Sequence, residues 1–206
     1  MSIQSQPLIK LNDGHKMPQF GLGTYVQFPS DERMRVYQSC RDAIKAGYRL
    51  IDTAYFYWNE DQIGMAINDA IRDGDTTRNE MFVVSKLAMN KASRAGVRES
   101  LTESLRTLGL AYVDLFLIHW PTAAKPNSNP YEPEFDDDID LHTETWLGME
   151  DAVRNGLTKS IGVSNYNARL ITNLVKVMLD IKSIYTTSCC TILPTGGKNQ
   201  TSCQSS

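Results

Sequence analysis

The chain has 206 residues, enough to bury the core of one domain. Its 21 Lys and Arg residues nearly balance 24 Asp and Glu residues, so charge gives no reason to expect nucleic acid or a membrane surface as a partner. No stretch approaches the ~18 apolar residues of a membrane-spanning helix, and residues 1–7 lack the features of a signal peptide. Three of the four cysteines follow residue 188, without the spacing of a disulfide framework or zinc site. We therefore expect a cytoplasmic protein without a metal.

The chain begins with a short hairpin pattern and an isolated strand. Residues 8–18 predict a hairpin with an Asp-Gly turn, and Phe20–Thr24 predicts the first strand of a larger sheet. The Gly21-Leu22-Gly23 motif lacks the third glycine of a dinucleotide fingerprint, because Val26 stands in that place. A strand end whose glycine lets a ligand approach the backbone is the better interpretation.

From this point strand and helix patterns alternate, with short connections. The predicted strands are 20–24, 48–51, 82–86, 113–119 and 160–164. The predicted helices are 30–46, 59–73, 97–108, 143–155 and 170–178. The first helix is expected to have Ser30 as N-cap and one face formed by Met34, Tyr37, Cys40 and Ile44. The alternation predicts parallel βα units with the helices outside the sheet, and either a barrel or a doubly wound sheet fits it.

Two segments depart from this alternation. Residues 122–140 hold three prolines and the acidic run Asp136–Asp138, and they fit a solvated insertion as well as a substrate-covering loop. Residues 183–187 fit a sixth strand, but residues 188–206 have scarcely any apolar pattern. We expect one domain over residues 1–182, followed by a divergent and disordered tail over residues 183–206.

Three predicted strands end in a polar side chain, at Asp52, Lys86 and His119, and Tyr57 follows soon after the first. Because the carboxyl ends of parallel strands meet at one edge, these side chains are expected to converge, although each alone is commonplace. The Lys86 ammonium would lower the pKa of the Tyr57 phenol from its usual ~10, while Asp52 would hold the lysine. His119 could then orient a carbonyl oxygen near the phenol. Such a phenol is a suitable proton donor for carbonyl reduction.

Several motifs closely resemble those of the aldo-keto reductase family, in particular its aldose and alcohol reductase branch. The motifs are Gly21–Tyr25, Gly47–Ala54, Tyr57–Glu60, Val84–Lys86, Leu108–Leu115, Ile118–Pro121 and Gly162–Tyr166. The resemblance runs from about Leu8 to about Lys182. It implies a (β/α)8 barrel of the TIM type, NADP(H) bound across the carboxyl-terminal mouth, and reduction of aldehydes or ketones to alcohols.

The resemblance also implies a role for each site residue. Tyr57 matches the proton donor, Lys86 and Asp52 match the pair that tunes it, and His119 matches the residue that places the substrate carbonyl. The implied cofactor-binding residues are Gly23, Thr24, Asp52, Ser164 and Asn165, the last two at the nicotinamide carboxamide. The implied substrate-binding residues are Tyr25, His119 and Trp120.

Residues 183–206 do not match the family, whose sequence continues with further strands and cofactor contacts. Five or six strands cannot close an eight-stranded barrel, so we expect an incomplete barrel with an open edge that can pair with another chain. We also expect this C-terminally truncated chain to bind NADP(H) weakly or not at all. The alternative to a reductase is a non-catalytic truncated isoform, which pairs with another chain or is inert. A shifted reading of the message and a truncated gene model both fit the tail.

Overall fold

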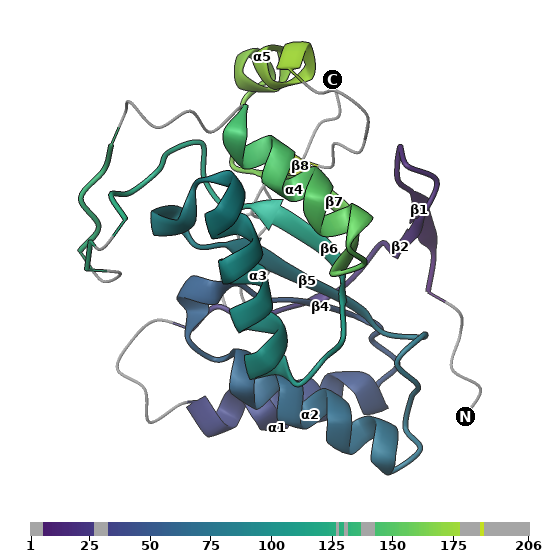
Figure 1. Cartoon of the computed structure of the whole chain (residues 1–206). Coiled ribbons are helices and arrows are strands. Elements are labelled where there is room, and N and C mark those ends of the chain that lie inside the picture. The colour runs from purple at the N-terminus through teal and green to yellow at the C-terminus, as the bar shows by residue number, and fades with distance from the viewer. Residues whose placement is uncertain are drawn as a thin grey trace, which may run out of the picture.

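The computed structural model describes residues 6–26, 33–126, 128–129, 132–136, 143–177 and 186–187. These residues form a sheet of six parallel strands and a separate antiparallel hairpin (Figure 1). The sheet contains β3 (Leu22–Gly23), β4 (Leu50–Asp52), β5 (Phe82–Leu87), β6 (Val113–Ile118), β7 (Thr158–Ser164) and β8 (Thr186–Thr187). The hairpin consists of β1 (Leu8–Lys10) and β2 (Lys16–Pro18).

A helix follows each of β3 to β7 in the chain. The helices are α1 (Arg33–Lys45), α2 (Glu60–Arg72), α3 (Arg94–Leu108), α4 (Glu144–Arg154) and α5 (Ala168–Val177). Helices α1 to α4 lie along one face of the sheet (Figure 1). The strands neighbour one another in sequence order from β3 to β8, without the reversal that marks a doubly wound sheet. This order is that of a (β/α) barrel, so it decides between the two architectures that the sequence left open.

The two faces of the sheet carry two separate apolar clusters, because successive side chains of a strand point to opposite faces. The cluster between sheet and helices includes Ile51, Val83, Phe116, Ile161, Ile63, Leu101 and Trp146. The cluster on the opposite face contains Leu50, Phe82, Val84, Leu115 and Leu117, together with Leu11 and Met17 from the hairpin region. The latter surface is the interior face of a barrel, and the N-terminal segment covers part of it.

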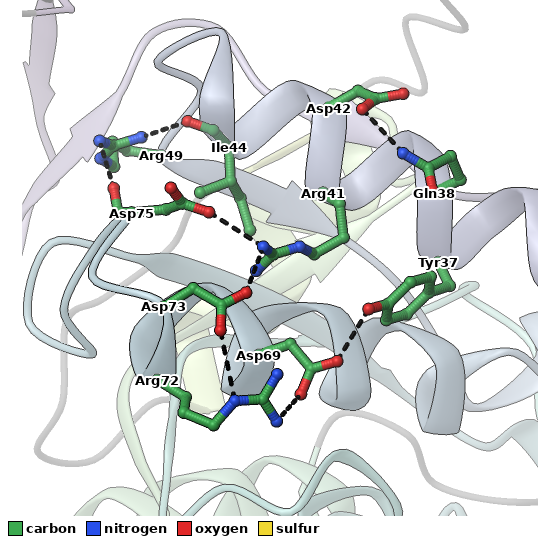
Figure 2. Close-up of polar contacts among 10 residues, drawn as sticks. All are labelled: Tyr37, Gln38, Arg41, Asp42, Ile44, Arg49, Asp69, Arg72, Asp73 and Asp75. Carbon is green, nitrogen blue, oxygen red and sulfur yellow. Dashed lines mark hydrogen bonds and ion pairs between the residues drawn. The ribbon is translucent and has the colours of Figure 1, made fainter.

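Polar contacts hold α1 against α2 and the turn after it (Figure 2). The buried Arg41 guanidinium donates hydrogen bonds to Asp73 at 2.7 Å and to Asp75 at 3.0 Å. One turn earlier on α1, the Tyr37 hydroxyl donates to Asp69 at 2.8 Å. The network therefore fixes the helices that flank β4, the strand that ends in Asp52.

The predicted order of strands and helices is confirmed for the first five βα units. One detail of α1 is wrong: Met34 is 59% exposed, while Val36, Cys40 and Ile44 are buried. These three residues follow the spacing of four, and Met34 lies in the first turn of the helix, off that stripe. The predicted N-cap Ser30 lies outside the described residues.

The sixth predicted strand is described at Thr186–Thr187, where β8 pairs with β7. The rest of the predicted tail lies outside the described residues, as do positions 127, 130–131 and 137–142 of the region around the proline-rich loop. Within that loop, Ala124 and Phe135 form an antiparallel bridge. Among the helices described, none has the length and apolar character needed to cross a bilayer.

Candidate active site

The register of the sheet brings three of the predicted site residues to one face. Asp52 lies opposite Val84 on β5, so Lys86, two residues further along, points to the same face as Asp52. Lys86 in turn lies opposite Leu117 on β6, and His119 follows two residues later. All three lie at or just beyond the carboxyl ends of their strands. The apolar interior face of the sheet thus becomes polar at this edge.

Lys86 is the hub of the site, with a side chain that is only 4% exposed. Its ammonium forms an ion pair with Asp52, donates to the Thr53 carbonyl oxygen at 2.9 Å and donates to the Tyr57 hydroxyl at 3.1 Å. Burial by itself lowers the pKa of Lys86, but Asp52 and Tyr57 stabilise the charge and leave the pKa above its usual value. The ammonium is therefore charged at neutral pH, and its contacts match its three N–H donors.

His119 packs beside the phenol and is 8% exposed. Its ring centre lies 5.7 Å from that of Tyr57, with an interplanar angle of 73°. Burial, helped by the Lys86 charge, lowers the pKa of His119 to about 3, so the imidazole is neutral at physiological pH. Within the described part of the chain, its Nδ1 atom has no hydrogen-bond partner. A neutral imidazole offers one N–H donor, the group needed to hold a carbonyl oxygen.

Two exposed aromatic residues flank this pair. The Tyr25 ring lies 5.2 Å from the Tyr57 ring in an edge contact, and the Trp120 ring stacks near His119 at 6.0 Å. Tyr25 is 64% exposed and Trp120 is 46% exposed. The structure therefore brings Tyr25 and His119 next to Tyr57, the predicted proton donor, and Trp120 next to His119.

Gly21, just before β3, and Gly23, at its end, differ in the space around their Cα atoms. A Cβ atom at Gly21 would come within 2.1 Å of the Leu50 side chain, so a larger residue there would force that side chain to shift. A Cβ atom at Gly23 would meet nothing within 4 Å, so the chain itself leaves room for a ligand at this position. The next residue, Thr24, is buried and its hydroxyl donates to the Asp52 carbonyl oxygen at 2.9 Å.

Ser164 and Asn165 lie at the carboxyl end of β7. The Asn165 backbone is left-handed, with φ of 63°, and its amide nitrogen donates to the His119 carbonyl oxygen at 2.9 Å and to the Ser164 hydroxyl at 3.1 Å. Because these bonds occupy both amide hydrogens, the side-chain oxygen is what Asn165 offers to a ligand. Asn165 also ties the end of β7 to the backbone of His119.

Sequence reasoning assigned no site role to four groups that the structure places close to Tyr57 and Lys86. They are the Thr53 carbonyl, the buried side chains of Asn59 and Glu60, and the Ser85 hydroxyl that donates to Glu60 at 2.7 Å. A backbone carbonyl leaves no mark in a sequence, and Asn59 read simply as the start of a helix. The one available signal was a carboxylate, Glu60, at the start of a helix.

Comparisons with known proteins agree with this architecture. Residues 19–189 match the model of the aldo/keto reductase family, so the expectation that the match ends near Lys182 is wrong for residues 183–189. Aldo-keto reductase AKR2E4 of Bombyx mori is 49% identical over 177 residues, which are 85% of this chain and 55% of that protein. Human aldo-keto reductase family 1 member C4 is 44% identical over 166 residues, 78% of this chain and 51% of that protein. The chain thus spans about half the length of the curated relatives it matches.

Solved structures give the same result. The crystal structure of Bombyx mori AKR2E4 in complex with NADP superimposes with a TM-score of 0.80 and 46% identity, covering 88% of this chain and 57% of that one. A structure of AKR2E5 complexed with NADPH also has a TM-score of 0.80, at 34% identity, covering 89% of this chain and 55% of that one. The predicted barrel class is confirmed, and the described sheet is incomplete relative to these structures.

The pKa of His119 predicts how stability depends on pH. The unfolded chain binds a proton at this residue below about pH 6.5, whereas the folded chain does so only near pH 3. Protons therefore favour unfolding between these values, by up to about 1.4 kcal/mol per pH unit. We expect His119→Phe, which keeps a ring but has no titrating group, to lose stability less steeply from pH 7 to pH 4. Urea unfolding of the unaltered chain and of His119→Phe measures the free energy of unfolding at each pH. Equal pH dependence of that free energy in both chains would contradict the lowered pKa of His119.

Proposed function

The chain belongs to the aldo/keto reductase family, and from this premise we propose that its site reduces aldehydes or ketones with NADP(H). The observation that carries the proposal is the contact of one buried ammonium, Lys86, with both the Asp52 carboxylate and the Tyr57 hydroxyl. A phenol beside a positive charge can release a proton and leave a stabilised phenolate. Reduction of a carbonyl group requires an acid that can give a proton to the carbonyl oxygen in this way.

Each of the four predicted catalytic side chains has its own role. Tyr57 donates the hydroxyl proton to the carbonyl oxygen, and the Lys86 ammonium stabilises the phenolate that remains. Asp52 holds Lys86 in place and balances its charge. The neutral imidazole of His119 donates a hydrogen bond to the same carbonyl oxygen and fixes its orientation beside the phenol. NADPH, when bound, supplies the hydride for the carbonyl carbon, so that the product is an alcohol.

The residues present fit such a cofactor. Gly23 leaves open space at the end of β3, and Ser164 and Asn165 present polar atoms at the end of β7. We propose that these residues, with Thr24 and Asp52, hold the nicotinamide end of NADP(H). Similarity to the NADP complex of Bombyx mori AKR2E4 supports this choice. The expectation of weak binding stays a prediction, and a fluorescence titration with NADPH tests it.

The outermost strands of the sheet, β3 and β8, suggest a second candidate function. In the described residues, the sheet runs from β3 to β8 and pairs with no further strand at either edge. Exposed strand edges are templates for pairing with another chain. The second proposal is a non-catalytic chain that associates with a copy of itself or with a related barrel. Size-exclusion chromatography that shows only monomers, alone and with a family member, would contradict this proposal.

The catalytic proposal predicts the effect of one hydroxyl. We expect Tyr57→Phe to lower turnover of an aldehyde such as benzaldehyde by at least about 100-fold at high NADPH concentration, because the general acid is lost. Tyr55→Phe is a matched control in the same short helical turn, Tyr55–Tyr57, since the Tyr55 hydroxyl contacts Glu103 instead of Lys86. That variant should keep most of the activity.

NADPH consumption at 340 nm measures both variants beside the unaltered chain. Equal turnover by Tyr57→Phe and the unaltered chain would contradict the role of Tyr57. An unaltered chain that consumes no NADPH in the presence of aldehydes and ketones would contradict the reductase proposal as a whole, and would favour the second candidate.

A further inference from the structure

Two consecutive buried polar residues, Asn59 and Glu60, follow the Tyr57 turn and are not used in the mechanism above. Asn59 is the residue before α2, the N-cap position, where an asparagine side chain ordinarily accepts a hydrogen bond from the backbone of the first turn and stabilises the helix. Here its side chain makes no such bond and is fully buried. It has therefore another function in the structure.

The Asn59 side chain instead links the ends of two strands. Its amide nitrogen donates to the Thr24 carbonyl oxygen at 2.7 Å, beyond β3. Its amide oxygen accepts a hydrogen bond from the Thr53 hydroxyl at 3.4 Å, beyond β4. Thr24 precedes Tyr25, and Thr53 is the residue whose carbonyl oxygen binds Lys86. Asn59 thus links the turn Tyr55–Tyr57, which carries the proposed acid, to the residues that follow β3 and β4.

Glu60 fastens the same turn to the next strand. Its carboxyl group accepts a hydrogen bond from the Ser85 hydroxyl at 2.7 Å, and the residue is 4% exposed. Ser85 points to the helix side of β5, while its neighbour Lys86 points to the interior side. Burial raises the pKa of Glu60, against the opposing effect of the Ser85 hydrogen bond. A buried carboxyl group needs a hydrogen-bond partner, and Ser85 provides one for Glu60.

The backbone between these residues and Tyr57 is also held in an unfavourable state. Trp58 has φ of 50° and ψ of 31°, a left-handed conformation that is unfavourable for a non-glycine residue. Such a conformation persists only where surrounding contacts impose it. The bonds of Asn59 and Glu60 are contacts of this kind, since they lie directly after the left-handed residue.

We propose that Asn59 and Glu60 are positioning residues, which hold the Tyr57 hydroxyl within hydrogen-bond distance of Lys86 by tying its turn to β3, β4 and β5. The role rests on the proposed function of Tyr57. The tolerance is small, because the Lys86–Tyr57 contact is 3.1 Å long and a further ~0.5 Å would end it as a hydrogen bond. A displacement of about 1 Å at a reacting group can lower a rate about 100-fold.

The experiment uses the full chain with ¹³C at the Cζ atom of tyrosine, and the Tyr57 resonance is identified by its loss in Tyr57→Phe. We expect Asn59→Ala and Glu60→Ala to shift and broaden that resonance, and to lower any NADPH-dependent turnover about 10- to 100-fold through kcat. Glu60→Gln should restore both readings, because its amide oxygen can still accept the Ser85 hydrogen bond.

A control separates positioning from general loss of stability. Glu150 on α4 is also a buried glutamate, bonded to Trp146 at 3.1 Å and Arg154 at 2.9 Å. We expect Glu150→Ala to destabilise the chain in urea but to leave the Tyr57 resonance unaltered. Ser85→Ala removes only the hydrogen-bond donor and provides the test if Glu60→Ala does not fold. The Tyr57 resonance of Ser85→Ala should shift in the same direction as that of Glu60→Ala.

The proposal is overturned if folded Asn59→Ala, Glu60→Ala or Ser85→Ala leaves the Tyr57 resonance in place, or if Glu150→Ala moves it as far. Because the resonance is read without cofactor, it reports on positioning even if the chain turns over no carbonyl substrate. Failure of the reductase proposal would appear as absent turnover with an intact resonance shift, so the two failures are distinguishable.

Discussion

The site depends on one buried positive charge. An ammonium group loses its hydration when it is buried, and it remains charged only if protein groups replace the water. At Lys86 those groups are the Asp52 carboxylate, the Thr53 carbonyl oxygen and the Tyr57 hydroxyl. The three acceptors come from the end of β4 and the turn after it, while the donor comes from β5. The charge therefore holds the segment that carries the phenol against the neighbouring strand.

The remainder of the fold makes this convergence possible. The alternation of side chains along each strand sends Ile51, Val83 and Ser85 toward the helices, and Leu50, Val84 and Lys86 toward the interior face. Along the interior face, apolar residues fill the part near the hairpin, and charged and polar residues appear where the strands end. The same register that builds the core thus places a lysine, a carboxylate and an imidazole together at the carboxyl ends of the strands.

Much of this arrangement could be predicted from sequence, because apolar runs that end in a polar side chain mark the carboxyl ends of buried strands. Asp52, Lys86 and His119 were found in this way, and family motifs added Ser164 and Asn165. Met34 was misplaced because it lies in the first turn of α1, off the stripe that Val36, Cys40 and Ile44 form at a spacing of four. Asn59 and Glu60 were missed because they also fit a helix start, and only coordinates show that their side chains bond Thr24 and Ser85.

The proposed role of Tyr57 depends on whether the Lys86 charge acts on its phenol. A pH titration followed by ¹³C NMR of Cζ-labelled tyrosine reports the ionisation of Tyr57 in the unaltered chain and in Lys86→Met, which keeps the length of the side chain without its charge. We expect the Tyr57 phenol of Lys86→Met to lose its proton at a pH at least about one unit higher than in the unaltered chain. Ionisation at the same pH in both chains would contradict it.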